Sequence, residues 1–322
     1  MKTRLEDGDV RALVDAFGLP AVTAWGEVAA GTINSNHWVE AGGRRWFLRV
    51  NEGKREEDVR YEAELVVALA DAGVRTPRPA TTPAGAPLVA HRGRWVSLFP
   101  WVPGVHRGAA DVTPADAAAV GAALAQLHRA GLPLASRFAR DGIYTTAHIA
   151  ARVDAIASDP RASGDAAVAH AVAIARDELA WLAERAAERA AAPRGVIHGD
   201  LFRDNVLFEG GELVALLDFE QASSGSLLYD VAVCINAWCY GDTFDPALVR
   251  AMWRGYTEGR VMHEERALFI ELRAAAMRFM VTRITDVHLP GVALPGKGFD
   301  RFQARLEAWR ALGAAGLAGW LA

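Results

Sequence analysis

Hydrophobic residues in the first fifty positions follow first a helical and then an alternating, strand-like pattern. From Val10 to Phe17 they recur at i, i+3, i+4 and i+7, which predicts an amphipathic helix that stops before Gly18. The segments 25–39 and 46–50 are typical of strands. The glycine pair at 42–43 between them suits a tight turn, so we predict a β-hairpin.

The next fifty residues repeat this order of helix and hairpin. A helix is predicted over 56–72, with Gly73 in position to end it. Two short strand-like segments, 87–90 and 94–99, follow and are joined by a turn signal, so a second hairpin is expected. Residues 1–99 therefore have the plan of a small α+β lobe.

The pattern changes after residue 104. Thr113 followed by Pro114 predicts the start of a helix, because threonine caps helices and proline suits the first turn. Long helical patterns cover 144–192 and most of 226–320. Only 195–218 has a strand pattern in this part of the chain. The second part is therefore predicted to be mostly helical.

Length and composition agree with two lobes. The chain has 322 residues, of which 52% are hydrophobic and 23% are charged, so it can bury two sizeable cores. We predict an α+β fold with a β-rich N-terminal lobe over 1–99, a hinge at 100–104 and a larger, mostly α-helical C-terminal lobe over 105–322.

Several classes of protein are disfavoured by the same numbers. A net charge of −4 offers no basic field for nucleic acid or for an anionic membrane. The N-terminus lacks the apolar core of a signal peptide, and no apolar run is long enough to span a bilayer. Two cysteines, Cys234 and Cys239, are too few for a disulfide framework. We expect a cytoplasmic protein with no nucleic-acid or membrane partner.

The segment HGDLFRDNVLFEGGELVALLDFE, residues 198–220, carries the chemistry. Its spacing, H-x-D-x-x-x-x-N followed by D-F, matches the arrangement used in kinase-type phosphoryl transfer. An Asp such as Asp200 can orient the attacking hydroxyl and accept its proton, and Asn205 and Asp218 offer hard oxygen ligands to Mg²⁺. The alternative is a polar turn before a strand, with Asp218 capping the next turn.

Further segments extend this pattern into a family resemblance. These are AAGTINSNHWVE, VSLFPWVPG at the hinge, LLDFEQASSGSLLYDVAVCINAWC and LRAAAMRFMVTRITD. With them the chain resembles the aminoglycoside phosphotransferase and choline kinase superfamily over nearly its whole length. Within it, the chain is most similar to the bacterial homoserine kinases of that kinase-like fold, with Asn236 and Trp238 in the corresponding helix motif.

The resemblance implies a role for each matching residue. The fold would be bilobal and protein-kinase-like, with an N-terminal lobe that binds nucleotide and a C-terminal lobe that carries catalysis and substrate binding. Asp200 would be the base, and Asn205 and Asp218 would hold Mg²⁺. The backbone from Leu98 to Pro100 would meet adenine. The loop over the ATP phosphates would comprise Ala30, Gly31, Asn34, Ser35 and Asn36.

The chain departs from the family at one position. The usual strand lysine that pairs the nucleotide phosphates is replaced by Arg49, which keeps the charge but has a different geometry. Its helix partner would be Glu62 or, one register on, Glu64, and the distance to the Gly73 cap favours Glu62. The alternative is that Arg49 is a surface residue on an edge strand.

The substrate site is less strongly indicated. Arg273, Arg278 and Arg283 are spaced by five along one predicted helix, so they cannot share one face. One of them would reach the cleft and bind a substrate carboxylate, and the others would be solvated. Further candidates are Arg203 and Asn236. His128 and the Tyr229–Asp230 pair are expected to be buried structural groups near the catalytic loop.

We therefore expect an ATP- and Mg²⁺-dependent kinase for a small hydroxylated metabolite. The resemblance favours L-homoserine, which would be converted to O-phospho-L-homoserine for threonine biosynthesis. Other acceptors known for this fold remain open, namely aminoglycosides, choline or ethanolamine, and amino sugars. A nucleotide-binding pseudokinase is a further alternative, which the intact Asp200, Asn205 and Asp218 disfavour.

Overall fold

The computed structural model describes residues 3–28, 34–258, 265–292 and 296–322. The chain divides into two compact units. The first contains Met1–Val105 together with Val206–Gly210 and Val214–Glu220, and the second contains His106–Asn205, Gly211–Leu213 and Gln221–Ala322. The first unit thus includes the end of the catalytic segment, with Asp218, as well as the N-terminal part.

Within the described residues of the first unit, five strands form one antiparallel sheet in the order β1-β2-β3-β5-β4. Gly42 and Gly43 both have positive φ, 60° and 71°, which lets the chain turn tightly between β2 and β3. β3 is paired along both edges and therefore lies inside the sheet. The strands are β1 Val22–Glu27, β2 Ser35–Ala41, β3 Arg44–Asn51, β4 Val89–His91 and β5 Arg94–Pro100.

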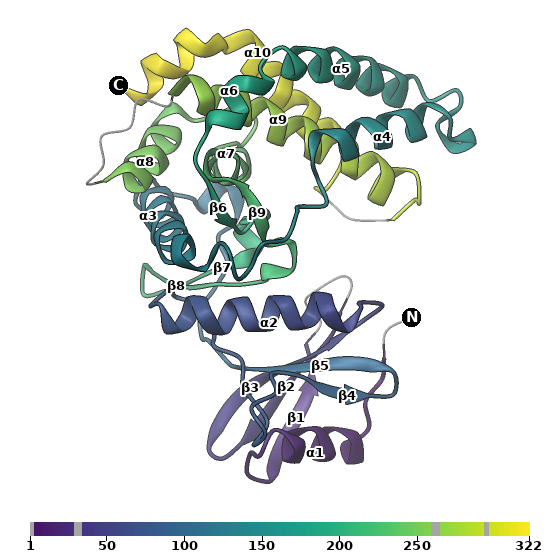
Figure 1. Ribbon diagram of the computed structural model, residues 1–322, viewed down its shortest axis with the longest axis vertical. Helices are drawn as coiled ribbons and strands as arrows, with labels where there is room; N and C mark the ends of the chain where they lie inside the picture. The colour runs from purple at the N-terminus through teal and green to yellow at the C-terminus, as the bar shows by residue number, and fades with distance from the viewer. Residues whose placement is uncertain (1–2, 29–33, 259–264, 293–295) are drawn as a thin grey trace. The chain divides into compact units, whose positions relative to one another are not determined.

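Two helices cover this sheet on opposite sides (Figure 1). α1 (Asp7–Ala16) buries its predicted apolar stripe against β2, β3 and β5, so that Leu48 and Val39 are fully enclosed. α2 (Glu56–Asp71) packs Val59 and Ala63 against Leu88. The sheet therefore has apolar cover on both faces.

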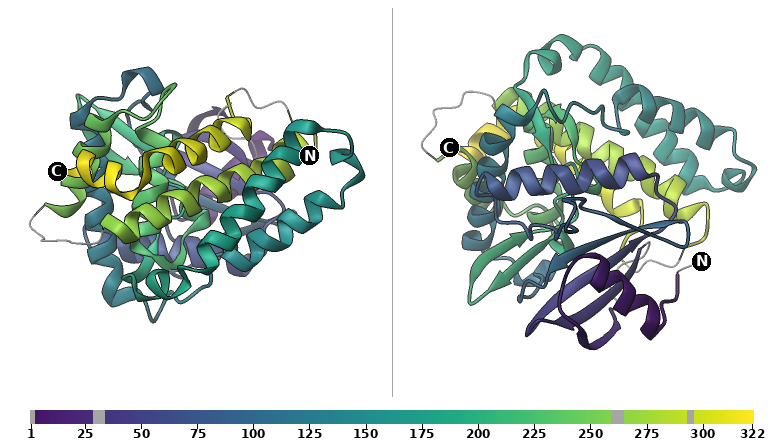
Figure 2. Two further views of the ribbon diagram at one scale, coloured as in Figure 1. Left: turned by 90° about the horizontal axis from the view of Figure 1, so that it is seen from above. Right: turned by 60° about the horizontal axis from the view of Figure 1, so that its bottom comes forward.

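The second unit is mostly helical. α7 (Leu227–Trp238) is its central helix, and nearly every residue of α7 is buried. α9 and α10 run side by side in yellow-green and yellow (Figure 2). The other helices are α3 Pro114–Gly131, α4 Thr146–Ala157, α5 Ala166–Ala183, α6 Ala186–Ala191, α8 Pro246–Thr257, α9 Glu265–Arg283 and α10 Asp300–Leu321.

α3 and α8 approach each other closely because each has a glycine at the contact. A side-chain carbon on Gly121 would collide with the backbone of Met252, and one on Gly255 would collide with the backbone of Ala118. The N-terminus of α3 is closed by the predicted cap, since the Thr113 side chain accepts from the Asp116 backbone and Asp116 bonds back to Thr113.

The α+β class and the predicted helices and hairpins of the N-terminal part are confirmed. One strand was missed. β9 (Ser223–Ser226) pairs with β6 (Arg194–Ile197), although its sequence SSGS consists of small polar residues without a strand pattern. The hairpin of β7 (Val206–Glu209) and β8 (Glu212–Leu216) was predicted. No helix in the described parts of the chain is long and apolar enough to cross a membrane.

Candidate active site

The catalytic segment follows β6 from His198, and its backbone is hydrogen-bonded to Asp230 on α7. The backbone N–H groups of His198 and Gly199 donate to the Asp230 carboxylate at 2.7 and 2.8 Å, and His128 Nε2 lies 3.1 Å from it. Asp230 is fully buried. Burial acts to raise the pKa of Asp230, but the hydrogen bond and charge of His128 outweigh it and the pKa is lowered. Asp230 and His128 are thus buried supports of the loop, as predicted.

A glycine is required at the next position of this loop. Gly199 has a φ of 77°, and a side-chain carbon there would lie 3.0 Å from the backbone oxygen of Gln221. On the same stretch, Trp238 Nε1 donates to the Leu201 carbonyl at 3.0 Å. The backbone on both sides of Asp200 is therefore anchored to α7 and its surroundings, which keeps the carboxylate in place.

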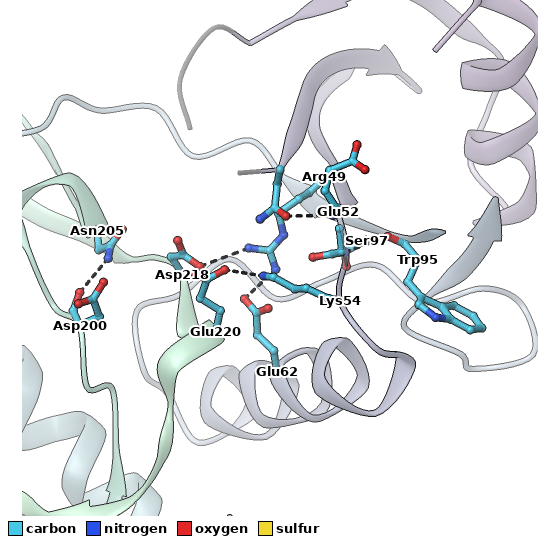
Figure 3. Close-up of polar contacts among 12 residues, drawn as sticks. Arg49, Glu52, Lys54, Glu62, Trp95, Ser97, Asp200, Asn205, Asp218 and Glu220 are labelled. Atoms are coloured by element: carbon cyan, nitrogen blue, oxygen red, sulfur yellow. Dashed lines mark hydrogen bonds and ion pairs between the residues drawn. The ribbon is translucent and has the colours of Figure 1, made fainter. Parts of the chain in front are cut away.

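Asp200 and Asn205 are brought together by the loop itself. Asn205 Nδ2 donates to the Asp200 backbone oxygen at 2.8 Å (Figure 3). Since the amide nitrogen is used inside the loop, the Asn205 carbonyl oxygen is the atom available to a metal ion. The Asp200 side chain keeps about a third of its surface exposed, 34%, so a substrate can reach it.

Arg278 of α9 faces the Asp200 carboxylate from within the second unit. Its Nη1 lies 3.5 Å from Asp200 Oδ1, and its guanidinium packs 3.8 Å from the Tyr144 ring and 3.7 Å from the Phe279 ring. Only 4% of Arg278 is exposed. A cation held by two aromatic rings in this way orients the carboxylate beside it.

The prediction that two of the three arginines on α9 are solvated was wrong. Arg273 is buried and bonded to Glu178 at 2.6 and 2.8 Å, Arg278 is buried beside Asp200, and Arg283 is half-buried. The reason is tertiary, because α9 packs against α4, α5, α7 and α10 and is covered on most sides. Helical spacing alone cannot reveal such cover.

The first unit contains a cluster of opposite charges around the buried side chains of Arg49 and Glu62. Arg49 Nη2 donates to Glu62 at 2.7 Å, and its Nη1 lies 3.5 Å from Asp218 Oδ1 (Figure 3). Lys54 donates to Glu220 at 2.5 Å beside them. Burial acts to lower the pKa of Arg49, but Glu62 and Asp218 raise it further than burial lowers it.

The two questions left open for Arg49 are thereby answered. The alternative of a surface arginine on an edge strand was wrong, because β3 is an inner strand and Arg49 is only 8% exposed. Its helix partner is Glu62, as the register favoured, and not Glu64. The arrangement is a strand cation, a helix carboxylate and a second carboxylate from the segment after β8.

Asp218 has the features of a ligand for a divalent cation. Its backbone φ is +63°, a strained value for a residue other than glycine. Burial, reinforced by the nearby charge of Glu220, raises the pKa of Asp218 to about 7, although Arg49 opposes the shift. Its Oδ1 accepts no hydrogen bond from the described residues. A carboxylate oxygen that accepts no hydrogen bond is a hard ligand that suits Mg²⁺ or a similar ion.

The residues expected over the ATP phosphates are only partly described. Gly31 and Ala30 lie outside the described residues. Asn34 Oδ1 accepts from the Glu52 backbone at 3.3 Å, and Ser35 Oγ donates to Glu52 Oε1 at 2.7 Å. Asn36 is paired directly across from Arg49 in the sheet, so the two side chains share one face. The sequence analysis did not identify Glu52 as a partner of these residues. The available signal was its position directly after β3.

Glu52 is an anchor for several segments of the first unit. Besides Ser35, its carboxylate accepts from the Thr3 backbone at 2.6 Å and from Arg94 Nε at 3.0 Å. Burial would raise the pKa of Glu52, but these hydrogen bonds lower it to about 2. Glu52 is therefore ionised, and its bond from Ser35 fixes the start of β2.

The hinge residues differ in what their backbone can offer. Leu98 is fully buried opposite Leu48, and its carbonyl already accepts from the Ala80 N–H at 2.8 Å. Pro100, the last residue of β5, has no N–H. The Trp101 N–H that follows already donates to the Arg45 carbonyl at 3.0 Å. The expected adenine contact therefore depends on backbone groups other than the Leu98 carbonyl and the Trp101 N–H.

Asn236 does not belong to a substrate site, contrary to the prediction. It is fully buried, its Nδ2 donates to the carbonyls of Ala232 and Leu272 at 2.9 and 3.0 Å, and its Oδ1 accepts from Trp309 Nε1 at 3.0 Å. The amide is consumed in joining three helices. Arg203, by contrast, donates to the Ala237 carbonyl and lines a cavity together with Arg283.

A comparison of the sequence with known protein families identifies the family of this chain. The phosphotransferase enzyme family matches residues 25–268. The chain belongs to this family. The resemblance inferred from the motifs is thereby confirmed.

The relatives and solved structures agree with this assignment. A homoserine kinase from Gluconacetobacter diazotrophicus is 34% identical over 305 residues, which is 91% of this chain and 90% of that protein. A spectinomycin phosphotransferase solved with ADP and spectinomycin has a TM-score of 0.70 at 15% identity, covering 96% of this chain and 99% of its own. An amicoumacin kinase solved in complex with AMP-PNP, Ca²⁺ and Ami has a TM-score of 0.67 at 15% identity, covering 95% of this chain and 93% of its own. These two structures establish the kinase-like fold.

Proposed function

We propose that this phosphotransferase is an ATP- and Mg²⁺-dependent homoserine kinase, which phosphorylates the side-chain hydroxyl of L-homoserine. The observation that carries the proposal is the 34% identity to a homoserine kinase along nine tenths of both chains. Asp200 and Asn205 support the reaction type, and they lie in one anchored loop in which Asn205 Nδ2 donates to the Asp200 backbone oxygen at 2.8 Å. ADP, AMP-PNP and Ca²⁺ in the two structural neighbours support the use of a nucleotide and a divalent cation.

In this proposal the first unit is the nucleotide-binding lobe and the second is the catalytic lobe. Arg49, oriented by Glu62, binds the nucleotide phosphates together with the loop around Gly31 and Asn34–Asn36. The backbone after Leu98, at Pro100, meets adenine. Asp218 and Asn205 hold Mg²⁺, which when bound neutralises charge on the β- and γ-phosphates.

Asp200 performs the proton transfer. Its carboxylate orients the homoserine hydroxyl and accepts its proton as the oxygen attacks the γ-phosphorus. The bond from that phosphorus to the β-phosphate oxygen breaks, and ADP and O-phospho-L-homoserine are formed. Arg278, 3.5 Å from Asp200, keeps the carboxylate oriented and is therefore a positioning residue.

The test is a panel of acceptors with the purified protein and MgATP. L-Homoserine, L-threonine, choline, ethanolamine, an amino sugar and an aminoglycoside are compared by coupled ADP release, and the product is identified by mass spectrometry. L-Homoserine is expected to have the highest kcat/KM, and L-threonine to react poorly because its hydroxyl is hindered. A higher kcat/KM for choline or an aminoglycoside would overturn the homoserine assignment. Nucleotide binding without turnover on any acceptor would favour a pseudokinase.

A further inference from the structure

A cavity of 370 Å³ in the second unit has a strongly cationic lining. It is bordered by the catalytic loop, the end of α9 and the first turns of α10. Among its described lining residues Asp204 is the single acidic one. We call it the cationic cavity, and its positive side chains are Arg107, Arg203, Arg283, Lys297, Arg301 and Arg305.

Two of these cations are already neutralised by carboxylates. Arg107 Nη2 lies 3.0 Å from Asp116, and Lys297 Nζ lies 3.3 Å from Asp204. The acidic lining residue Asp204 is thus already paired with Lys297. Four arginines of the lining remain, namely Arg203, Arg283, Arg301 and Arg305. The positive charge of the cavity is thus concentrated on those four side chains.

Arg203 and Arg305 are held in place by groups that do not cancel their charge. Arg305 donates to the backbone carbonyls of Asn236 and Arg301 at 2.8 and 2.6 Å, and Arg203 donates to the carbonyl of Ala237. Backbone carbonyls satisfy N–H groups but carry no net charge. Both guanidinium groups therefore remain fixed, partly buried positive charges.

Arg283 is the member of the set that is best placed to receive an anion. It packs over the Phe302 ring at 5.1 Å, and no carboxylate of the described residues forms an ion pair with it. Burial lowers the pKa of Arg283, and the charges of Arg278 and Arg301 add to the effect, whereas Asp200 opposes it. A half-buried arginine among other cations is short of negative charge.

Asp200 is not among the described lining residues, but the catalytic loop that carries it contributes Phe202, Arg203 and Asp204 to the lining. Arg203 follows Asp200 by three residues, and Arg283 interacts electrostatically with Asp200. Arg278 is different, because it is only 4% exposed, its guanidinium lies 3.8 and 3.7 Å from the Tyr144 and Phe279 rings, and it is not among the described residues that line the cavity. Of the two arginines considered for a substrate carboxylate, Arg283 is therefore the one that opens into a cavity.

We propose that the cationic cavity is the specificity site of the enzyme: Arg283 binds the carboxylate of the acceptor, Arg203 and Arg305 supply the surrounding positive field, and cationic alcohols are repelled. The inference rests on the proposed function and deepens it, since it defines the acceptor class as a hydroxy acid or amino acid. A carboxylate matches a planar guanidinium through two parallel hydrogen bonds. Choline and aminoglycosides bring like charge to the same place.

The experiment compares the wild type with Arg283→Gln, Arg283→Lys and a matched control, Arg310→Gln, which changes an exposed arginine of α10 outside the cavity. Two acceptors are used, L-homoserine and 2-aminobutane-1,4-diol, in which the carboxylate is replaced by a hydroxymethyl group. Loss of a charge-paired contact is expected to lower kcat/KM for homoserine roughly 30-fold or more in Arg283→Gln. KM for ATP is expected to stay unchanged, kcat/KM for the cationic diol is expected to stay the same or to rise because a repelling charge is removed, and Arg283→Lys is expected to be intermediate.

The ratio of the two acceptors separates recognition from general damage. The inference stands if the preference for homoserine over the diol collapses in Arg283→Gln and persists in Arg310→Gln. An unchanged preference in Arg283→Gln would overturn it while leaving the homoserine kinase proposal intact. If the acceptor panel instead identifies a substrate without an acidic group, both proposals fail. If it identifies another hydroxy acid, the homoserine assignment fails, and the same ratio test with that acid decides on Arg283.

Discussion

Arg49 on β3 and Glu62 on α2 form a buried ion pair of 2.7 Å, with 8% and 3% of the two residues exposed. Removing one member leaves the other charge buried without its partner. The second nitrogen of Arg49 lies 3.5 Å from Asp218, so the same side chain also connects the helix carboxylate to the proposed metal ligand.

We predict that Arg49→Ala lowers the free energy of unfolding by about 3–5 kcal/mol, because Glu62 is left unpaired. The double variant Arg49→Ala/Glu62→Ala is expected to be more stable than the sum of the single variants, which urea unfolding of the four proteins measures. Additive losses would show that the pair is not coupled. In kinetics, Arg49→Lys is expected to retain a lower KM for ATP than Arg49→Ala, because the charge is kept.

Asp200→Asn tests the proposed base. We predict that kcat falls by about two to four orders of magnitude, because proton transfer is lost while the loop backbone remains anchored by Asp230. KM for ATP and the melting temperature are expected to stay close to the wild type. Steady-state kinetics and thermal unfolding measure both, and a near-normal kcat would show that another group accepts the proton.

Asp218 makes the stability of the metal-free protein depend on pH. Its pKa is raised from 3.8 to about 7, so between these values the folded protein binds a proton that the unfolded chain has released. The contribution of Asp218 to stability is therefore complete below pH 3.8 and is lost as the pH rises towards 7. We predict that the unfolding free energy of the wild type, measured relative to that of Asp218→Asn, decreases as the pH rises over this range.

Chemical unfolding of both proteins in EDTA, at pH values from 5 to 8, provides the measurement. Asp218→Asn cannot ionise at this position and serves as the reference for every other titrating group. With Mg²⁺ and ATP present, the wild type is expected to gain more stability than Asp218→Asn, because the variant lacks the anionic ligand. A difference that does not change with pH in EDTA would contradict the raised pKa.

Asp230→Asn tests the support of the catalytic loop. The carboxylate accepts from two backbone N–H groups and contacts His128, and an amide offers only one acceptor oxygen. We predict a loss of about 2–3 kcal/mol in unfolding free energy together with a lower kcat. The matched control is Asp242→Asn at an exposed position, which is expected to change neither. If Asp230→Asn were as stable as the wild type, Asp230 would not be the anchor of the catalytic loop.

Much of the local structure followed from the sequence because it depends on neighbours in the chain. Apolar periodicity identified α1 and α2, and the Thr113 cap marked the start of α3. Motif spacing likewise identified the loop that bonds Asn205 to Asp200, because those residues are separated by only one turn. The register of α2 was sufficient to favour Glu62 over Glu64.

Other features were decided only by the tertiary structure. β9 forms from small polar residues because β6 supplies its hydrogen bonds, and its sequence SSGS has no pattern that predicts a strand. Asn236 lies in the core because its amide meets Leu272 and Trp309, which are distant in the chain. Packing of α9 against α4, α5, α6, α7 and α10 determined which arginine supports Asp200 and which one opens into the cationic cavity. Local periodicity specifies the elements, but burial and charge pairing depend on partners that only the folded chain brings together.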